Sequence, residues 1–174
     1  MNIYAFTIIA SGLDTETDDF EEKFLEAGCD DATISIQKGA IVLEFTREAR
    51  NFAHALVSAV KSVRAAGAKV EHIEPDYLVS LSEIASRAEV SKASISLYAK
   101  GQRAEGFPAP VARITTESPL WDWFEVARWM YRRKSLSLNV VVEAKMVRQA
   151  NLALMQPEGF EAVFAKKFRE ELAA

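Results

Sequence analysis

Apolar residues recur along the first 75 positions with two different periods, one typical of strands and one typical of helices. Strands are predicted where β-branched and aromatic residues gather, at 2–10, 32–37, 40–45 and 69–73. Helices are predicted where apolar residues stand three or four apart, at 18–27 and 52–66, and Gly28 and Gly67 follow them as terminators. The element order of this segment is therefore β-α-β-β-α-β.

This order is the one found in ferredoxin-like domains. Right-handed crossovers would place both helices on one face of a four-stranded antiparallel sheet. Lys38 and Gly39 predict a tight hairpin turn between the second and third strands. Because folds of this kind serve many roles, we expect residues 1–75 to form a domain for dimerisation or for sensing an effector.

The segment 78–100 predicts two short helices joined by a tight turn. Ser80 and Glu83 have the S-x-x-E spacing of a capping box at the start of the first helix. The apolar side of that helix consists of Leu81, Ile84, Ala85 and Ala88. Val90 is an apolar residue in the turn, and Ser91 is a suitable N-cap for the second helix.

The second helix of this pair has few apolar positions, and we expect Ile95, Ala99 and Tyr98 to face inward. At 100° per residue, the opposite side contains Ala93, Ser96, Leu97 and Lys100, with Lys92 beside them. A short helix face of this kind, with a lysine near each end, suits entry into the major groove of DNA.

Residues 78–130 resemble a winged helix-turn-helix of the excisionase and MerR kind. The matching segments are L-x-S-x-x-E-I-A-x-R-A-x-V-S, then GQRAEGFPAPV and PLWDWFEVARWM. The resemblance implies that the last two segments supply a wing hairpin and the helix that closes the domain. At the turn, where such proteins usually have a left-handed glycine, this chain has Glu89, which we expect to carry backbone strain.

For the wing we predict strands at 111–115 and 120–121, joined by a turn at 116–119. The helix that follows begins at Asp122, and Glu125 at its third position predicts a second capping box. Trp121 and Trp123 are expected to be buried anchors, because they flank an amphipathic helix.

Two further apolar helices are predicted at 136–155 and 160–172. The predicted architecture is α+β, with a ferredoxin-like domain at 1–75, a winged helix-turn-helix at 76–134 and a C-terminal helical extension at 135–174. The apolar faces of the extension need a cover, either from the same chain or from a second subunit. We expect a homodimer, because two-fold symmetry doubles the DNA site that one helix-turn-helix contacts.

Charge is unevenly distributed along the chain. Residues 1–79 contain 7 Lys and Arg against 14 Asp and Glu, whereas residues 80–134 contain 9 against 6. The basic surplus therefore coincides with the predicted helix-turn-helix, so the overall charge of −4 does not exclude DNA binding.

The sequence lacks the patterns that catalysis, metals or nucleotides require. His54 and His72 are far apart and have no catalytic partner at a suitable spacing, and the seven glycines form no phosphate-binding series. The acidic residues at 14–22 and 30–31 lack the spacing of a calcium loop. Cys29 is expected to be passive, and a single cysteine fits a reducing cytoplasm. We therefore predict no cofactor, no enzyme activity and no membrane span.

The sequence predicts a cytoplasmic, sequence-specific regulator that binds double-stranded DNA, acting as a repressor or autoregulator. The resemblance also admits an antitoxin-like or mobile-element role. The residues predicted to contact DNA are Ser91, Lys92, Ala93, Ser94, Ser96, Leu97, Lys100, Arg103 and Arg113. The alternative is a non-catalytic adaptor that binds a protein partner and whose helix-turn-helix is structural.

Overall fold

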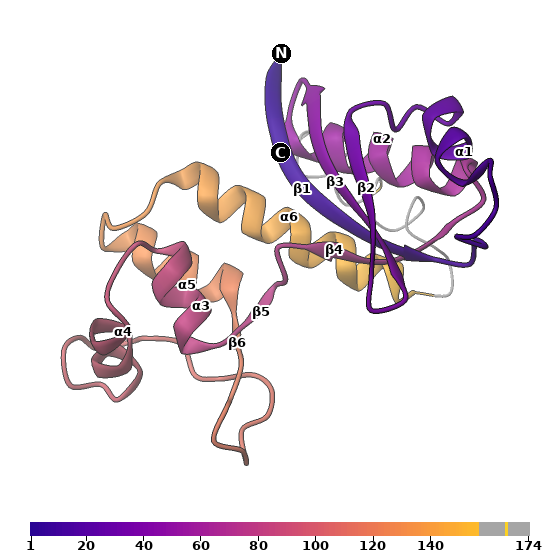
Figure 1. Cartoon of the computed structure of the whole chain (residues 1–174). Helices are drawn as coiled ribbons and strands as arrows, with labels where there is room; N and C mark the ends of the chain where they lie inside the picture. Colours follow the sequence, from indigo (N-terminus) through magenta and orange to yellow (C-terminus); the bar gives the residue numbers. More distant parts are fainter. Residues whose placement is uncertain (157–165, 167–174) are drawn as a thin grey trace. The chain divides into compact units, whose positions relative to one another are not determined.

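The computed structural model describes residues 1–156 and Lys166, and shows a mixed α+β chain (Figure 1). The chain forms two compact units. The first consists of residues 1–75 together with the described residues from Gln149 onward, and the second of residues 76–148. The helix predicted at 160–172 lies outside the described residues, apart from Lys166.

The first unit contains a four-stranded antiparallel sheet with strand order β2-β3-β1-β4. Its elements are β1 (Asn2–Ser11), α1 (Phe20–Glu26), β2 (Ala32–Gln37), β3 (Ala40–Ala49), α2 (Phe52–Ala65) and β4 (Lys69–Glu74). Helices α1 and α2 lie behind the sheet in Figure 1, on the same face. The predicted elements of this segment are confirmed, and β3 continues four residues beyond its predicted end.

The core of the first unit lies between the sheet and these two helices. Alternate residues of β1 and β3 are buried there, as the two-residue period of a strand requires. The ring of Phe6 stacks on Phe45 with 5.4 Å between centroids and meets Phe52 of α2 edge-on at 5.9 Å. Val60 and Val63 of α2 are fully buried. This layer holds α2 against the two central strands.

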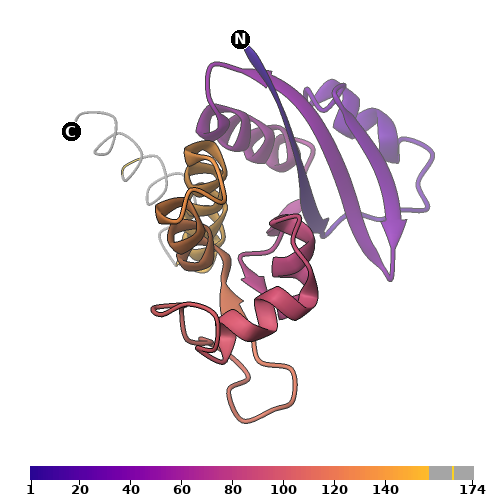
Figure 2. The ribbon, with the colours of Figure 1, turned by 90° about the vertical axis from the view of Figure 1, so that its left-hand side faces the viewer.

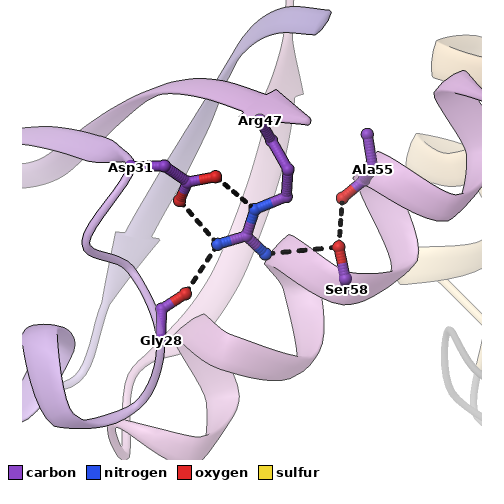
Figure 3. A network of polar contacts seen from close by, with 5 residues as sticks. All are labelled: Gly28, Asp31, Arg47, Ala55 and Ser58. Atoms are coloured by element: carbon purple, nitrogen blue, oxygen red, sulfur yellow. Dashed lines mark hydrogen bonds and ion pairs between the residues drawn. The ribbon is translucent and has the colours of Figure 1, made fainter. Parts of the chain in front are cut away.

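One inward position of β3 is occupied by an arginine, Arg47, which is 8% exposed (Figure 3). Its Nε and Nη2 donate to the two carboxylate oxygens of Asp31, both at 2.7 Å, and Nη2 also donates to the carbonyl of Gly28 at 2.6 Å. Nη1 donates to Ser58 Oγ at 3.3 Å, and that hydroxyl donates to the carbonyl of Ala55 at 3.0 Å. The guanidinium therefore fastens the α1–β2 loop to β3 and α2.

A second buried polar side chain, Asn151 of α6 (Leu138–Leu154), closes the outer edge of β4. Its Oδ1 accepts from the backbone N–H of Ile73 and its Nδ2 donates to the Ile73 carbonyl, both at 2.8 Å. Within the extension predicted at 135–174, residues up to Arg148 belong to the second unit, and the described residues from Gln149 onward belong to the first. The boundary at Pro75 and Asp76 coincides with the predicted one.

The second unit is helical apart from one short strand pair. Its elements are β5 (Leu78–Val79), α3 (Leu81–Arg87), α4 (Lys92–Ala99), β6 (Trp121–Asp122), α5 (Trp123–Arg132) and the first part of α6. Strands β5 and β6 pair antiparallel, with Val79 opposite Trp121. Ile84, Ile95 and Met130 are among the fully buried residues of its core. Trp121 and Trp123 are buried, as predicted.

The predicted wing hairpin is reduced to a single bridge between Ala112 and Leu120. Residues 111–115 do not form a strand, because Arg113 adopts a left-handed backbone with φ 51° and its carbonyl accepts from the Thr116 N–H at 3.0 Å in a turn. Trp121, predicted as a wing residue, pairs instead with β5. The segment from Pro108 to Leu120 is therefore a long loop (Figure 1).

Asp122 is the N-cap of α5, as predicted, but its side chain bonds to the second residue of the helix and the predicted second capping box does not form. Asp122 accepts from the Phe124 N–H at 3.0 Å and binds Arg148 Nε at 2.9 Å. Burial raises the pKa of Asp122, and the Arg148 guanidinium opposes that shift. Glu125 does not complete the box; its carboxylate pairs with Arg128 and Arg148 instead.

Candidate nucleic-acid interface

The α3–α4 pair begins with the predicted capping box, which is confirmed. The Glu83 carboxylate accepts from the Ser80 N–H and hydroxyl, both at 2.7 Å, while Ser80 Oγ accepts from the Glu83 N–H at 3.3 Å. These hydrogen bonds lower the pKa of Glu83. They fix the first turn of α3, against which α4 packs through Ile84 and Ala85.

The turn between α3 and α4 passes through Glu89 in the left-handed conformation, with φ 53°, as predicted. The Val90 N–H donates to the Ala85 carbonyl at 3.0 Å and the Glu89 N–H to the Ser86 carbonyl at 3.2 Å, a Schellman-type ending. The chain thereby reverses within a few residues, and α3 and α4 follow one another directly (Figure 2).

Helix α4 is anchored by one fully buried side chain, Ile95. Ser91 is its N-cap, as predicted, and accepts from the Ser94 N–H at 3.1 Å. Ala99, predicted to face inward, is exposed. The inner side of the last turn is covered instead by Tyr98, whose ring packs on Phe107 at 6.3 Å between centroids.

The opposite side of α4 is open to solvent. Lys92, Ala93 and Lys100 are exposed, Leu97 is 39% exposed and Ser96 is half-buried. Residues 91–100 contain no acidic side chain. Neither lysine forms an ion pair with another residue that the structure describes. This surface is the one predicted to meet DNA.

Arg103 lies beside α4 in a defined position. Its Nη1 donates to Ser94 Oγ at 2.7 Å, and its guanidinium carbon is 5.4 Å from the centre of the Tyr98 ring. Ser94 Oγ also accepts from the Ser91 hydroxyl at 2.9 Å. Ser91 and Ser94 were predicted to offer hydroxyls to DNA, but in this structure both bind within the protein. Their geometry positions the arginine.

An aromatic cluster that was not predicted joins the end of α4 to α5 and to the loop that follows α4. Trp129 of α5 meets Tyr98 at 5.1 Å and Phe107 at 5.2 Å between ring centroids. Trp129 Nε1 donates to the Glu105 carbonyl at 3.2 Å, and Arg133 lies over the same indole ring at 4.8 Å. Three aromatic residues within a basic segment are the sequence signal from which this cluster could have been suspected.

Arg113 lies apart from this cluster, in the exposed turn of the loop 113–119. Its side chain makes no ion pair with any other described residue. The turn is held by its backbone: Thr116 Oγ1 donates to the Arg113 carbonyl at 2.9 Å. The structure therefore brings eight of the nine predicted contact residues together on or beside α4, with Arg113 on a separate turn.

The described residues offer little for other chemistry. They contain no cluster of three or more His, Cys, Asp or Glu residues able to hold a metal. Burial raises the pKa of the Cys29 thiol to about 11, so the thiol stays protonated near neutral pH and is a weak nucleophile. None of the described helices is both long and apolar enough to cross a bilayer.

Comparisons of the chain with protein-family models, curated proteins and solved structures found no match. The geometry of the second unit is therefore the basis for a functional conclusion.

Proposed function

We propose that the protein is a sequence-specific regulator that binds double-stranded DNA through α4. The observation that supports this most strongly is the open, acid-free face of α4, which has a lysine near each end and rests on the buried Ile95. Lys92 and Lys100 are eight residues apart, about 12 Å along a helix axis. That span matches the width of the major groove, so the two ammonium groups can approach phosphates on its two sides.

Between the lysines, the exposed surface is small and mostly apolar. Ala93 and Leu97 would contact base edges, thymine methyl groups in particular, and the Ser96 hydroxyl would donate to or accept from a base. Arg103 would bind a backbone phosphate, because Ser94 and Tyr98 already hold its guanidinium and little side-chain entropy is lost. Arg113 would reach a phosphate or the minor groove from its turn.

The arrangement of elements supports a finer description of both units. For residues 1–75 we propose the ferredoxin-like fold, supported by the order β-α-β-β-α-β and the strand order β2-β3-β1-β4. For residues 76–134 we propose a helix-turn-helix with a rudimentary wing, supported by the α3–α4 turn and the Ala112–Leu120 bridge. A cytoplasmic homodimer acting as a repressor or autoregulator would present two copies of α4 to a palindromic site.

The test is binding to duplex DNA from upstream of the protein's own gene, and to a random-sequence duplex, across a series of salt concentrations. The wild type is compared with Lys92→Glu/Lys100→Glu. The matched control is Lys38→Glu/Lys61→Glu, which changes the net charge equally at exposed positions of the first unit. Circular dichroism checks that all three proteins are folded.

We expect the wild type and the control to bind the upstream duplex at least a hundredfold more tightly than the α4 variant, with an affinity that falls steeply as salt rises. Equal weak binding of all three proteins to both duplexes would overturn the proposal. That result is what an adaptor with a purely structural helix-turn-helix predicts.

A further inference from the structure

The two edges of the sheet in the first unit are finished differently. The outer edge strand β4 contains the charged residues Lys69, Glu71 and Glu74. The side-chain amide of Asn151 also bonds to the N–H and carbonyl of Ile73 on this strand. The other edge strand, β2, has the sequence ATISIQ, with no charge, no proline and no register shift against β3. Sheet edges are normally protected by such devices, because an unprotected strand pairs with other chains.

The backbone of β2 has free groups at defined residues. Asp31 and Thr46 are a hydrogen-bonded pair, since the Thr46 N–H donates to the Asp31 carbonyl at 3.0 Å. Bonding alternates along an antiparallel ladder, so Thr33, Ser35 and Gln37 bond to β3. Ile34 and Ile36 therefore direct N–H and C=O outward, where no described strand pairs with them.

A hollow of about 470 Å³ lies between this edge and α1, which is drawn beside β2 in Figure 1. Leu25 and Ile34 give it an apolar floor, and Glu21, Glu22 and Asp30 supply acidic groups. Leu25 is 61% exposed, and Ile36, farther along β2, is 46% exposed. The hollow thus combines free backbone groups, apolar surface and negative charge.

The rim of the hollow is rigid. Asp30 lies between Gly28 and Asp31, and Arg47 binds both of these residues (Figure 3). The loop that presents Asp30 and begins β2 is therefore held in place before any ligand arrives. A preformed edge lowers the entropy lost when a flexible chain binds.

We propose that β2 and α1 form a docking site for an extended, basic segment of another protein, which adds to the sheet as a fifth strand. Its backbone would bond to Ile34 and Ile36, and its alternate side chains would lie in the hollow. Charge complementarity identifies the occupant: lysine or arginine beside apolar residues would meet Glu21, Glu22 and Asp30. A second copy of this chain is disfavoured, because pairing two β2 edges would bring two acidic α1 helices together.

The probe is the acetylated and amidated hexapeptide Lys-Thr-Val-Thr-Lys-Thr, compared with Glu-Thr-Val-Thr-Glu-Thr. Binding is followed on the full-length protein by NMR, through the amide shifts of Ile34, Ile36 and Ala32. We expect the basic peptide to shift these amides and to bind at least tenfold more tightly than the acidic one. Shifts confined to other residues, or equal or absent binding of the two peptides, would overturn the proposal.

Two pairs of variants separate charge from backbone. Glu21→Lys/Glu22→Lys should reverse the peptide preference, whereas Glu26→Lys, on α1 but outside the hollow, should not. Ile36→Pro removes an outward N–H and should weaken binding about tenfold, whereas Ile36→Thr keeps that donor and should not. Unchanged binding by a folded Ile36→Pro variant would contradict strand addition.

Self-association is measured by sedimentation of the same proteins. If the wild type dimerises and Ile36→Pro does not, the occupant of β2 is a second copy and the peptide proposal is wrong. If the two have the same oligomeric state, the edge is free for a partner, as proposed. Neither result bears on DNA binding by α4, so the two proposals can fail separately.

Discussion

The cations of the two units are used in opposite ways. In the first unit, the Arg47 guanidinium is buried and all three of its nitrogens donate to partners within the unit. In the second, Lys92, Lys100, Arg103 and Arg113 are exposed and form no ion pair with the residues that the structure describes. All three nitrogens of the buried Arg47 guanidinium have partners, whereas the exposed cations near α4 form no ion pair with a described residue, and Arg103 is held by one hydrogen bond from Nη1 to Ser94 Oγ.

The second unit has its own structural ion pair, Asp122–Arg148, which joins the start of α5 to α6. This pair lies on elements other than α4. Ion pairs in both units therefore connect elements of the fold, whereas most of the exposed cations named above lie on or beside the proposed DNA-binding helix. Substitutions at the two kinds of position should separate stability from binding.

The largest effect is expected for Arg47→Met. Removing the guanidinium leaves the Asp31 carboxylate without its cation, and losing one partner of a buried pair costs about 3–5 kcal/mol. Denaturant unfolding measures the loss. Arg50→Met is the control, because Arg50 is exposed and makes one hydrogen bond to His54. Similar losses for the two variants would contradict a structural role for Arg47.

A smaller loss is expected for Asn151→Leu. The substitution leaves the N–H and carbonyl of Ile73 without their side-chain partner, and about 2 kcal/mol of unfolding free energy should be lost. The same unfolding measurement applies, with the more exposed neighbour Leu152→Ala as control. DNA affinity of the folded protein should not change. A stability equal to that of the control would show that the amide adds nothing to the β4 edge.

In the second unit, Ser80→Ala should cost about 1 kcal/mol, because it removes the N-cap acceptor of α3. Ser82→Ala, on the exposed side of the same helix, is the control.

The pKa of Glu83 is lowered in the folded state. The contribution of Glu83 to the free energy of unfolding is therefore present above its unfolded pKa, near 4.5, and is lost as the pH falls through its folded pKa. Unfolding followed from pH 7 to pH 3 should show this loss in the wild type and a reduced loss in Glu83→Gln.

The smallest effect, and the only one in the stabilising direction, is expected for Glu89→Gly. Glycine adopts the positive φ of this turn without steric cost, and the gain should be about 0.5 kcal/mol after the larger unfolded-state entropy of glycine is subtracted. Glu89→Ala removes the carboxylate but keeps Cβ, so it should give no gain. A gain in the alanine variant would mean that charge, and not backbone strain, is the cause.

Local signals predicted the starts of α3 and α4 and the turn between them well. The S-x-x-E spacing at Ser80 placed the start of α3, and the left-handed Glu89 followed from the position that the turn requires. Ile95 was assigned inward by its helical phase, and the same phase failed for Ala99 because Tyr98 covers the end of the helix. Phase gives the direction of a side chain, whereas burial depends on what lies beyond it.

Contacts between residues far apart in the sequence could not be predicted. Nothing near Asn151 in the sequence indicates that it binds Ile73, 78 positions earlier. The wing was overpredicted because the β-branched residues after Arg113 suggest a strand, whereas the backbone turns at Arg113 itself. Arg47 could have been recognised from the sequence. It stands at a position of β3 whose alternate neighbours are apolar and buried, and a buried charge needs a partner.

The contact between Asn151 and Ile73 also bears on protein synthesis, because a chain emerges from the ribosome N-terminus first. Residues 1–75 appear early, but the side chain that closes the β4 edge is made after the whole of the second unit. The second unit ends at Arg148, whereas the contact that closes the β4 edge also needs residue 151. Until residue 151 has been made, the N–H and carbonyl of Ile73 lack their side-chain partner. A ribosome that stalls before this residue leaves the β4 edge without that contact.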